Sequence, residues 1–255
     1  MIKIENVEVM GWDAAIRGMR NPMNSWQLSD SHPCLAKVLE SDCEMVMNEH
    51  EPAKECNDGE FGFCIGEKDF ALMSKLRNAG TDHRKFMRMI TVYLDITAPL
   101  YWWKEFSTYK VGTVANSCST MHKLTAKKFS MEDFSFEDCD NWTKDVVCSC
   151  IINALNMNRG KYLETKDKEI WRQMIQLLPS SYNQRRTVML NYEVLANIYK
   201  ARRNHKLDEW RKFCAWIETL PYSELITGKN ETKDMEETKE RAEAAVVYPG
   251  KVCDV

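Results

Sequence analysis

Residues 113–120 hold the side chains of this chain that are best suited to chemistry. The run contains, at consecutive positions, Asn116, Ser117, Cys118, Ser119 and Thr120. Hydroxyl, carboxamide and thiol groups at this density offer many hydrogen-bond groups on a short backbone, as a polar ligand requires. An ordinary capped turn has the same composition. The residue types therefore indicate a candidate polar-ligand site whose chemistry depends on its surroundings.

The elements before this run must position it. Residues 89–96 alternate β-branched and aromatic side chains with a period near two, which predicts a strand. Pro99 suits the first turn of a helix, where its missing N–H would have had no partner. We expect a short helix from Pro99 to about Thr108, with Trp102, Trp103 and Phe106 as its apolar body. Gly112 breaks this helix.

A second informative stretch lies between Pro179 and Glu209. Residues 185–190 predict a strand, and Asn191 a helix N-cap, because its carboxamide oxygen can accept the orphan N–H bonds of a first turn. An apolar stripe predicts a helix that continues to about Arg203. A second helix is expected over residues 207–220, ending at Pro221.

Both stretches resemble the flavin-dependent thymidylate synthases, the thymidylate-synthase-complementing family. That family carries an APxxxxxQxxRHR helix followed by a polar strand that ends SxRY. Ala98 and Pro99 fall on AP, Glu105 on the glutamine, Cys118 on the serine and Thr120 on the arginine. Residues 108–110, Thr-Tyr-Lys, fall on RHR. The spacing is kept without a gap, while most signature residues are replaced.

The C-terminal stretch resembles the family pattern LP…N-x-R…N…R…H-x-x-x-E. The matching residues are Pro179, Asn191, Asn197, Arg202, His205 and Glu209. Glu193 stands where the family has an arginine. The two matching blocks occur in the family's order and cover about half of the chain.

The resemblance implies a flavin site. In the family the RHR triplet and the two asparagines hold FAD at subunit interfaces, where arginine forks meet phosphates. Here the corresponding residues are Thr108, Tyr109, Lys110, Asn191 and Asn197. Tyr109 could stack on an aromatic ring, and Lys110 supplies one point charge without bidentate recognition. Alternatively, Asn191 is a simple helix cap and Tyr109 a surface aromatic.

The resemblance also implies a site for dUMP. It assigns the catalytic positions to Glu105 and Cys118, and the nucleotide contacts to Glu105, Cys118, Ser119, Thr120 and Arg202. Because Thr120 replaces an arginine, we expect Arg202 to carry most of the phosphate charge. Alternatively, Arg202 is a surface arginine favoured near a helix C-terminus by the helix dipole.

Cys118 invites a further hypothesis, that its thiolate attacks the pyrimidine ring. This would require a lowered thiol pKa, supplied by Lys110 or by a helix end. The family is understood to use reduced flavin without an enzyme nucleophile. We therefore interpret Cys118 as a small hydrogen-bonding or packing residue.

Composition excludes several other classes. The net charge of −3 gives no basic stripe for nucleic acid, and no apolar run approaches a membrane helix. The ten scattered cysteines, in a chain with fifteen methionines and no visible signal peptide, favour a reduced, cytoplasmic protein without disulfides. The five histidines are dispersed, and Cys148 and Cys150 point apart on a helix, so we expect no metal site.

Other expectations concern the scaffold. Residues 2–9 alternate like a first strand, and Asp13 could cap a helix that follows. Residues 31–60 are expected to form an irregular excursion, with a short strand near 61–65. A helix is expected from about Asp69, stopped at Gly80. Further on, the expected helices start at Thr143, closed by Gly160, and at Thr165, ended by Pro179.

These inferences predict an α/β (α+β) protein with a central, mainly antiparallel sheet flanked by helices. Residues 1–227 are expected to form one domain, with a charged tail at 228–255. The resemblance implies a homotetrameric enzyme that transfers a one-carbon group from methylenetetrahydrofolate to carbon 5 of dUMP, with NADPH reducing through FAD. The alternatives are a related flavin enzyme acting on another pyrimidine nucleotide, and a non-catalytic nucleotide-binding paralogue.

Overall fold

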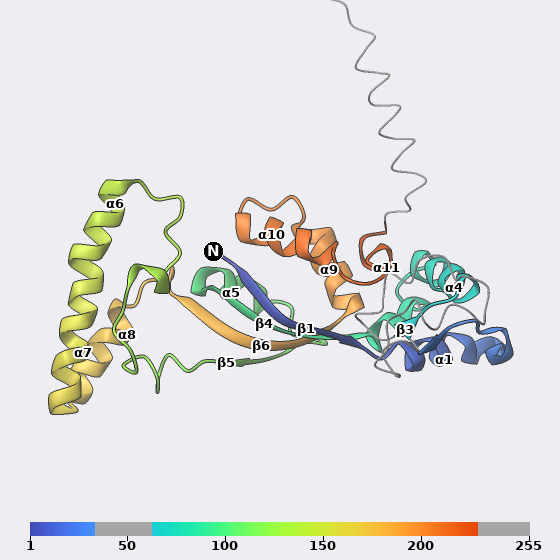
Figure 1. The fold of residues 1–255 in the computed structure, drawn as a ribbon, viewed down its shortest axis with the longest axis horizontal. Coiled ribbons are helices and arrows are strands. Elements are labelled where there is room, and N and C mark those ends of the chain that lie inside the picture. Colours follow the sequence, from blue (N-terminus) through green and yellow to red (C-terminus); the bar gives the residue numbers. More distant parts are fainter. Residues whose placement is uncertain (34–62, 229–255) are drawn as a thin grey trace, which may run out of the picture.

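A computed structural model describes residues 1–33 and 63–228 of the chain. Its centre is an antiparallel sheet of four strands in the order β1-β4-β6-β5 (Figure 1). The strands are β1 (Lys3–Met10), β4 (Thr91–Pro99), β5 (Val114–Ser117) and β6 (Asn183–Asn191). The predicted antiparallel sheet and its flanking helices are thus confirmed, and the polar run 113–120 contributes the edge strand β5.

The two central strands bury one face of the sheet. Register pairs Val92 with Leu190 and Leu94 with Val188, and all four side chains are buried. Alternate residues point to the other face, where Asp95 lies opposite Thr187. This period of two is the pattern that predicted both strands.

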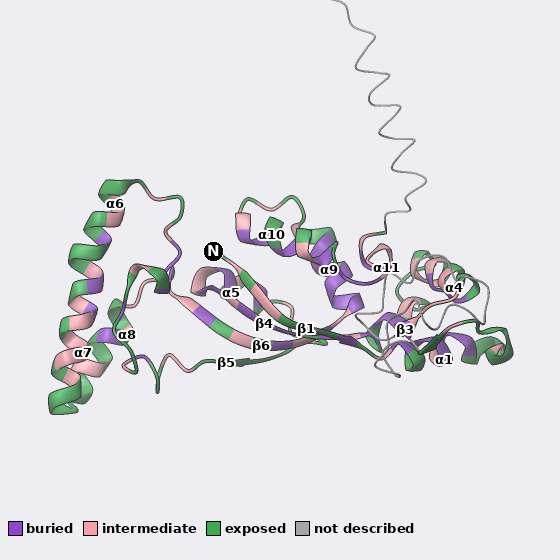
Figure 2. Cartoon of the chain, in the orientation of Figure 1, coloured by how far each residue is buried: buried purple, intermediate pink, exposed green. Residues whose placement is uncertain are grey.

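Helices cover the apolar face. They are α5 (Leu100–Phe106), α9 (Tyr192–Arg202) and α10 (Asp208–Ile217), while α11 (Glu224–Thr227) packs against α9 and α4. Figure 1 shows α5, α9 and α10 together on one side of the strands. Trp102 and Trp103 of α5 are almost completely buried, and Trp102 packs against Trp210 and Phe213 of α10. Figure 2 shows the buried side of α9 lying toward the sheet. Burial of these large rings supplies the main apolar stabilisation of the layer.

A group of short elements lies at one end of the sheet. It comprises α1 (Trp12–Arg20), η1 (Asn21–Met23), η2 (Trp26–Leu28), β2 (His32–Pro33), β3 (Phe63–Cys64), α4 (Glu67–Asn78) and η3 (Arg84–Arg88). The buried Asp69 ties them together, since it accepts a hydrogen bond from Arg20 at 2.6 Å and others from Ser29 and Ser31. Burial raises the pKa of this carboxyl, but these hydrogen bonds lower it overall. Helix α4 begins at Glu67, close to the predicted start at about Asp69, and Asp69 itself anchors the first turn of the helix.

A helical extension lies at the other end of the sheet (Figure 1). It contains η4 (Met131–Asp133), α6 (Asn141–Val146), the π-helical turn η5 (Val147–Ile152), α7 (Asn153–Thr165) and α8 (Lys168–Leu177). These elements pack around their own cluster, which includes Phe129, Leu155 and Met174. Figure 2 shows α7 with a largely exposed outer surface.

Several predicted helix ends are wrong. Asp13 caps nothing, because the N-cap of α1 is Gly11 and Asp13 pairs with Arg17. Asp140, not Thr143, caps α6, and Asp167, not Thr165, caps α8. Gly160 does not end a helix as predicted, because α7 continues through it to Thr165. A Cβ at Gly160 would meet open space.

The predicted cap at Asn191 is confirmed, and two predicted segments lie mostly outside the described residues. Asn191 caps α9, its Oδ1 accepting from the Val194 N–H at 3.0 Å. Most of the expected excursion at 31–60, and all but Gly228 of the predicted tail, lie outside the described residues. In the described ranges no helix is long and apolar enough to cross a membrane. The same ranges contain no cluster of three or more metal-ligating side chains.

Candidate functional site

Glu105 is the centre of a polar cluster between α5, α9 and α10. Its Oε2 accepts hydrogen bonds from Arg202 Nη1 at 2.6 Å and from Trp210 Nε1 at 3.0 Å. Arg202 also donates from Nε to the Tyr109 hydroxyl at 3.0 Å. The fold thereby brings together three predicted site residues, Glu105, Tyr109 and Arg202, from positions almost a hundred residues apart.

The Arg202 guanidinium is held by rings as well as by charge. Its Cζ lies 4.8 Å from the centre of the Trp210 ring and 5.8 Å from that of Tyr109. Guanidinium groups bind the faces of aromatic rings favourably. The Arg202 and Glu105 side chains remain 19% and 35% exposed, so the ion pair is open to solvent and to a ligand.

His205 completes the cluster. Its Nδ1 accepts the Leu207 N–H at 3.2 Å, which places the proton of the neutral ring on Nε2. Nε2 lies 3.5 Å from Glu105 Oε2. The Glu105 carboxylate thus faces one permanent cation, an indole N–H and a ring that can become a second cation. An anion that bound at Arg202 would share the positive charge of the guanidinium with Glu105.

Cys118, Ser119 and Thr120 follow the edge strand β5. The Cys118 N–H donates to the Arg185 carbonyl at 2.9 Å, and its own carbonyl accepts from Gln184 Nε2 at 2.7 Å. The thiol is exposed. Ser119 Oγ accepts the N–H groups of Met121 and His122. Pairing to β6 therefore fixes this segment at Cys118 and leaves its thiol exposed, while Ser119 and Thr120 are partly exposed.

Within residues 1–33 and 63–228, no hydrogen bond or ion pair joins residues 118–120 to Arg202 or to Lys110. The proposed joint phosphate contact of Arg202 with this segment stays a prediction. The activation of Cys118 by Lys110 likewise receives no support from a contact within the described chain.

The turn after α5 lies beside the start of α9. Thr108 closes the helix, donating from both its N–H and its Oγ1 to the Glu105 carbonyl. Gly112 has φ +78°, and a Cβ there would stand 2.9 Å from Asn191 Nδ2. This close approach places Gly112, two residues after Lys110, beside Asn191. A ligand contact shared by residues 108–110 and Asn191 stays a prediction. The buried Thr113 Oγ1, in the same turn, has no hydrogen-bond partner in the described structure.

Asn197 lies on α9 six residues after Asn191, in a different, basic environment. It is exposed, and its Oδ1 accepts from Arg84 Nη2 at 3.4 Å. The buried Glu193 on the same helix pairs with Arg84 and Arg88. Burial raises the pKa of Glu193, but the hydrogen bonds and charges of Arg88 and Arg84 together outweigh it and lower the pKa overall. Glu193 therefore neutralises cations here and is not itself a candidate anion-binding group.

Sequence reasoning did not assign a site role to Trp210 or Arg84. No local sequence pattern marks either residue as functional. Trp210 lies in an apolar helical stripe, which predicts a core residue, and Arg84 has the character of a surface charge. Their contacts with Glu105 and Asn197 depend on packing between distant elements. By contrast, the sequence pattern does include His205 and Glu209.

Glu209 is buried and accepts a hydrogen bond from Tyr101. Burial, followed by this contact, raises the pKa of the Tyr101 phenol.

Comparison with known proteins gives a structural likeness only. No protein-family model matches the chain, and no curated protein does. A crystal structure of thymidylate synthase X from Helicobacter pylori with FAD and dUMP has a TM-score of 0.58 and 16% sequence identity, covering 89% of this chain and 98% of that one.

A second structure of the flavin-dependent thymidylate synthase from H. pylori, complexed with FAD and dUMP, gives a TM-score of 0.55 and 17% identity. It covers 88% of this chain and 99% of that one. The chain therefore has a mixed helix and antiparallel-sheet fold like that of thymidylate synthase X, over nearly the whole length of those enzymes.

Proposed function

We propose that this protein is an FAD-dependent enzyme of the thymidylate synthase X type. The reaction would transfer a one-carbon group from methylenetetrahydrofolate to carbon 5 of dUMP, with NADPH as the source of reducing equivalents. The observation that carries the proposal is the fold likeness, which spans the whole length of enzymes solved with FAD and dUMP. The cluster around Glu105 supports it, because it gathers residues from both stretches of the sequence resemblance.

The nucleotide would bind where Arg202 is exposed between two aromatic rings. Arg202 would hold the phosphate, and Glu105 would set the position of the guanidinium before the ligand arrives. The hydroxyls and backbone of residues 118–120 would supply further hydrogen bonds, with Cys118 as a neutral contact. The exposed thiol and the absence of a cation bonded to it in the described chain favour this role over that of a nucleophile.

Two polar groups of this chain, the Thr113 hydroxyl and the Asn191 carboxamide, fit a flavin. The orphaned Thr113 Oγ1 and the Asn191 carboxamide lie in one turn region and can bond a polar ring edge. Thr108, Tyr109, Lys110 and Asn197 would provide the remaining contacts, with sites shared between chains of a homotetramer. Bound FAD would supply the hydride chemistry. The chain's own residues would orient the ring system and hold the nucleotide against it.

The test is direct. The full chain should purify with FAD, or bind it in equimolar amount, and should release tritium from dUMP labelled at carbon 5 when methylenetetrahydrofolate and NADPH are present. A protein that shows no flavin fluorescence change on titration and no calorimetric response to dUMP would overturn the proposal.

A second candidate rests on the Glu105–Arg202 ion pair. Because a carboxylate already neutralises the proposed phosphate-binding cation, a different pyrimidine nucleotide, or binding without catalysis, fits the same site. Titration of dCMP and dTMP beside dUMP identifies the base. Tight nucleotide binding by a flavin-free, inactive protein would favour the non-catalytic paralogue.

A further inference from the structure

Arg186 places a cation on the helix-covered face of the sheet. On β6 it stands between Gln184 and Val188 on that face, opposite Ile96 of β4 and Ser117 of β5. Gln184, Val188 and Ile96 are buried, and Arg186 itself is half-buried. Removing a charge from water costs free energy unless partners compensate for it, and burial lowers the pKa of Arg186. The partners of this cation therefore decide what it can do.

Within the described ranges, neutral groups alone hold the Arg186 side chain. Its Cζ lies 4.2 Å from the centre of the buried Trp103 ring, and its Nε donates to Gln184 Oε1 at 3.0 Å. In residues 1–33 and 63–228, no carboxylate forms an ion pair with it. Arg185, the preceding residue of β6, points to the other face of the sheet and pairs with Asp95 at 2.7 Å. Of these two neighbouring cations, Arg186 is the one that the described chain does not neutralise.

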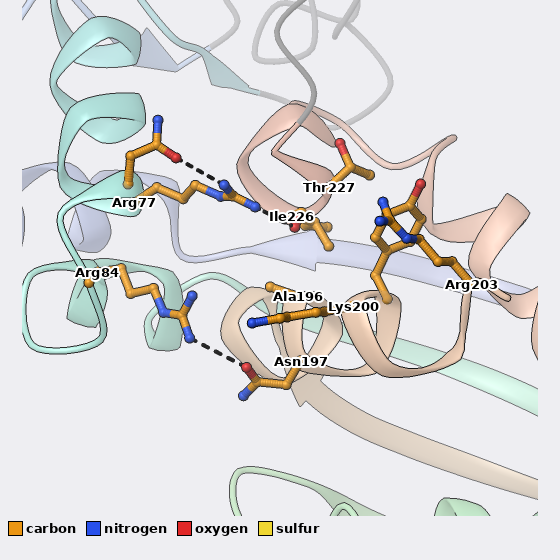
Figure 3. Close-up of a pocket in the computed structure, with 11 residues that line it drawn as sticks. Arg77, Arg84, Ala196, Asn197, Lys200, Arg203, Ile226 and Thr227 are labelled. Carbon is orange, nitrogen blue, oxygen red and sulfur yellow. Dashed lines mark hydrogen bonds between the residues drawn. The ribbon is translucent and has the colours of Figure 1, made fainter. Parts of the chain in front are cut away.

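The two terminal nitrogens of Arg186, Nη1 and Nη2, form no hydrogen bond within the described chain. Arg77 shows the opposite case. It lines the basic pocket between α4, α9 and α11, whose other cations are Arg84, Lys200 and Arg203 (Figure 3). Its Nε, Nη2 and Nη1 donate to the carbonyls of Leu225 and Ile226 and to Asn78 Oδ1. The Arg186 fork, in contrast, is anchored at Nε and offers both ends to a ligand with two acceptor oxygens.

Gln184 holds this fork beside the polar run that follows β5. The carboxamide that accepts from Arg186 also donates, from Nε2, to the Cys118 carbonyl at 2.7 Å. Gln184 is itself buried, and its backbone carbonyl accepts from Trp103 Nε1 at 2.9 Å. One fixed side chain therefore sets the positions of the guanidinium and of the backbone at Cys118.

The polar run supplies neutral donors next to the cation. Ser117 lies directly opposite Arg186 in the sheet, and Ser119 follows two positions later. Ser119 Oγ accepts two backbone N–H groups, which leaves its hydroxyl hydrogen available. Within the described residues, neither serine hydroxyl donates a hydrogen bond to another group. A guanidinium fork with two hydroxyl donors matches the three terminal oxygens of a phosphate monoester better than the two oxygens of a carboxylate.

We propose that Arg186 binds the phosphate of the pyrimidine nucleotide, together with the hydroxyls of Ser117 and Ser119. The identity of the nucleotide rests on the proposed function, whereas the preference for phosphate follows from the guanidinium and its neighbours. Arg186 lies outside both sequence patterns that suggested the other nucleotide contacts. It would add a second cation to Arg202, which already shares its charge with Glu105. Arg186 would thereby make the site select a nucleotide over the corresponding nucleoside.

The experiment is calorimetric titration of the full chain, in the presence of FAD, with dUMP, deoxyuridine and inorganic phosphate. The test variant is Arg186→Gln. The matched control is Arg185→Gln, which removes the same charge from the next position of β6 but on the opposite face of the sheet. Both variants should unfold within a few degrees of wild type, since neither loses a buried ion pair. Arg186→Lys serves as a second test variant should the glutamine not be tolerated.

Arg186→Gln should weaken dUMP binding by about ten- to hundredfold, the scale of a lost charge-assisted contact, and leave deoxyuridine unchanged. Arg186→Lys should fall between this variant and wild type, because lysine keeps the charge but cannot form two parallel hydrogen bonds. Arg185→Gln should stay within about twofold of wild type for every ligand, because an exposed ion pair contributes little.

Equal dUMP affinities of the Arg186 variants and the Arg185 control would overturn the proposal. An equal loss for dUMP and deoxyuridine would also overturn it, because a purely structural role of Arg186 does not distinguish a nucleotide from a nucleoside. Failure of the thymidylate synthase proposal alone gives a different pattern, in which dUMP binds no more tightly than inorganic phosphate but both still depend on Arg186. A wild-type protein that binds neither would overturn both proposals.

Discussion

The substitution Glu105→Gln separates two roles for the cluster around Arg202. Glutamine has the shape of glutamate and can still accept the Trp210 N–H, which lies 3.0 Å from Oε2, but it carries no charge. The Arg202 guanidinium, now 2.6 Å from a carboxylate oxygen, would keep its position and lose its counter-ion. A phosphate would no longer have to compete for it.

The expected gain in dUMP affinity follows from the solvent exposure of the Glu105–Arg202 ion pair. A hydrogen bond to a charged group contributes about 1.5–3 kcal/mol when well formed, and an exposed ion pair only about 0–1 kcal/mol. With side chains 19% and 35% exposed, the pair lies between these limits. We expect a gain of about 1–2 kcal/mol, so that dUMP binds roughly 5- to 30-fold more tightly.

The assay is calorimetric titration of dUMP into wild type, Glu105→Gln and the control Asp208→Asn. Asp208 is an exposed carboxylate of α10 that pairs with Arg211 and Lys212, so its substitution removes the same charge away from Arg202. The control should leave the dissociation constant within about twofold of wild type, since exposed pairs contribute little.

Arg202→Ala completes a double-mutant cycle. Alone it should weaken dUMP binding by about one to two powers of ten, the value of one charge-assisted bond. In the Arg202→Ala background, Glu105→Gln should add no affinity, because no cation remains to be released. The reasoning is refuted if Glu105→Gln leaves the affinity unchanged or weakens it, or if its gain persists without Arg202.

Three further predictions test other parts of the chain. Cys118→Ser should keep a substantial part of the turnover with dUMP, since a hydroxyl preserves the hydrogen bond; complete loss with nucleotide binding intact would favour a covalent thiol mechanism. Hydrogen bonds from Thr187, Arg185 and Asn6 lower the pKa of Asp95 to about 2, below its unfolded value of about 3.9. Its ionised form thus stabilises the fold above about pH 4, and this contribution is lost as pH falls through about 2. Unfolding midpoints between pH 5 and pH 2 should fall less steeply for Asp95→Asn, and identical slopes would contradict the assignment. Burial, with the charge of Glu218, raises the pKa of the Cys214 thiol to about 11; alkylation at about pH 8, read by peptide mass, should label the exposed Cys118 and spare Cys214 until the protein unfolds.

Local patterns in the sequence determined the sheet and its immediate connections. Alternation along residues 89–96 and 185–190 predicted β4 and β6, because a strand buried on one face must place apolar residues at every second position. Asn191 was predicted as a cap for an equally local reason, since its side chain bonds a backbone N–H three residues away. The spacing of Pro99, Glu105 and Cys118 also preserved the resemblance to a known family, and the fold agrees with it.

Helix boundaries followed the sequence less well. Gly160 was predicted to end a helix, yet α7 continues through it to Thr165. An isolated glycine costs a helix only about 1 kcal/mol, which packing of α7 against Met174 of α8 and the other residues of that cluster can offset. Thr143 and Thr165 were predicted as N-caps, but Asp140 and Asp167 cap α6 and α8. Both residue types can cap a helix, so the backbone conformation decides which one does.

The tertiary structure alone decided the candidate sites. Glu105 was predicted as a ligand contact, but its pairing with Arg202 and Trp210 joins residues separated by 97 and 105 positions. The basic pocket likewise unites Arg77 with Lys200 and Ile226. Charge and hydrogen-bond geometry act over a few ångströms, whereas sequence patterns record only neighbours along one helix or strand. Only the packing of the helices therefore determines which cations pair with a carboxylate and which remain available to a phosphate.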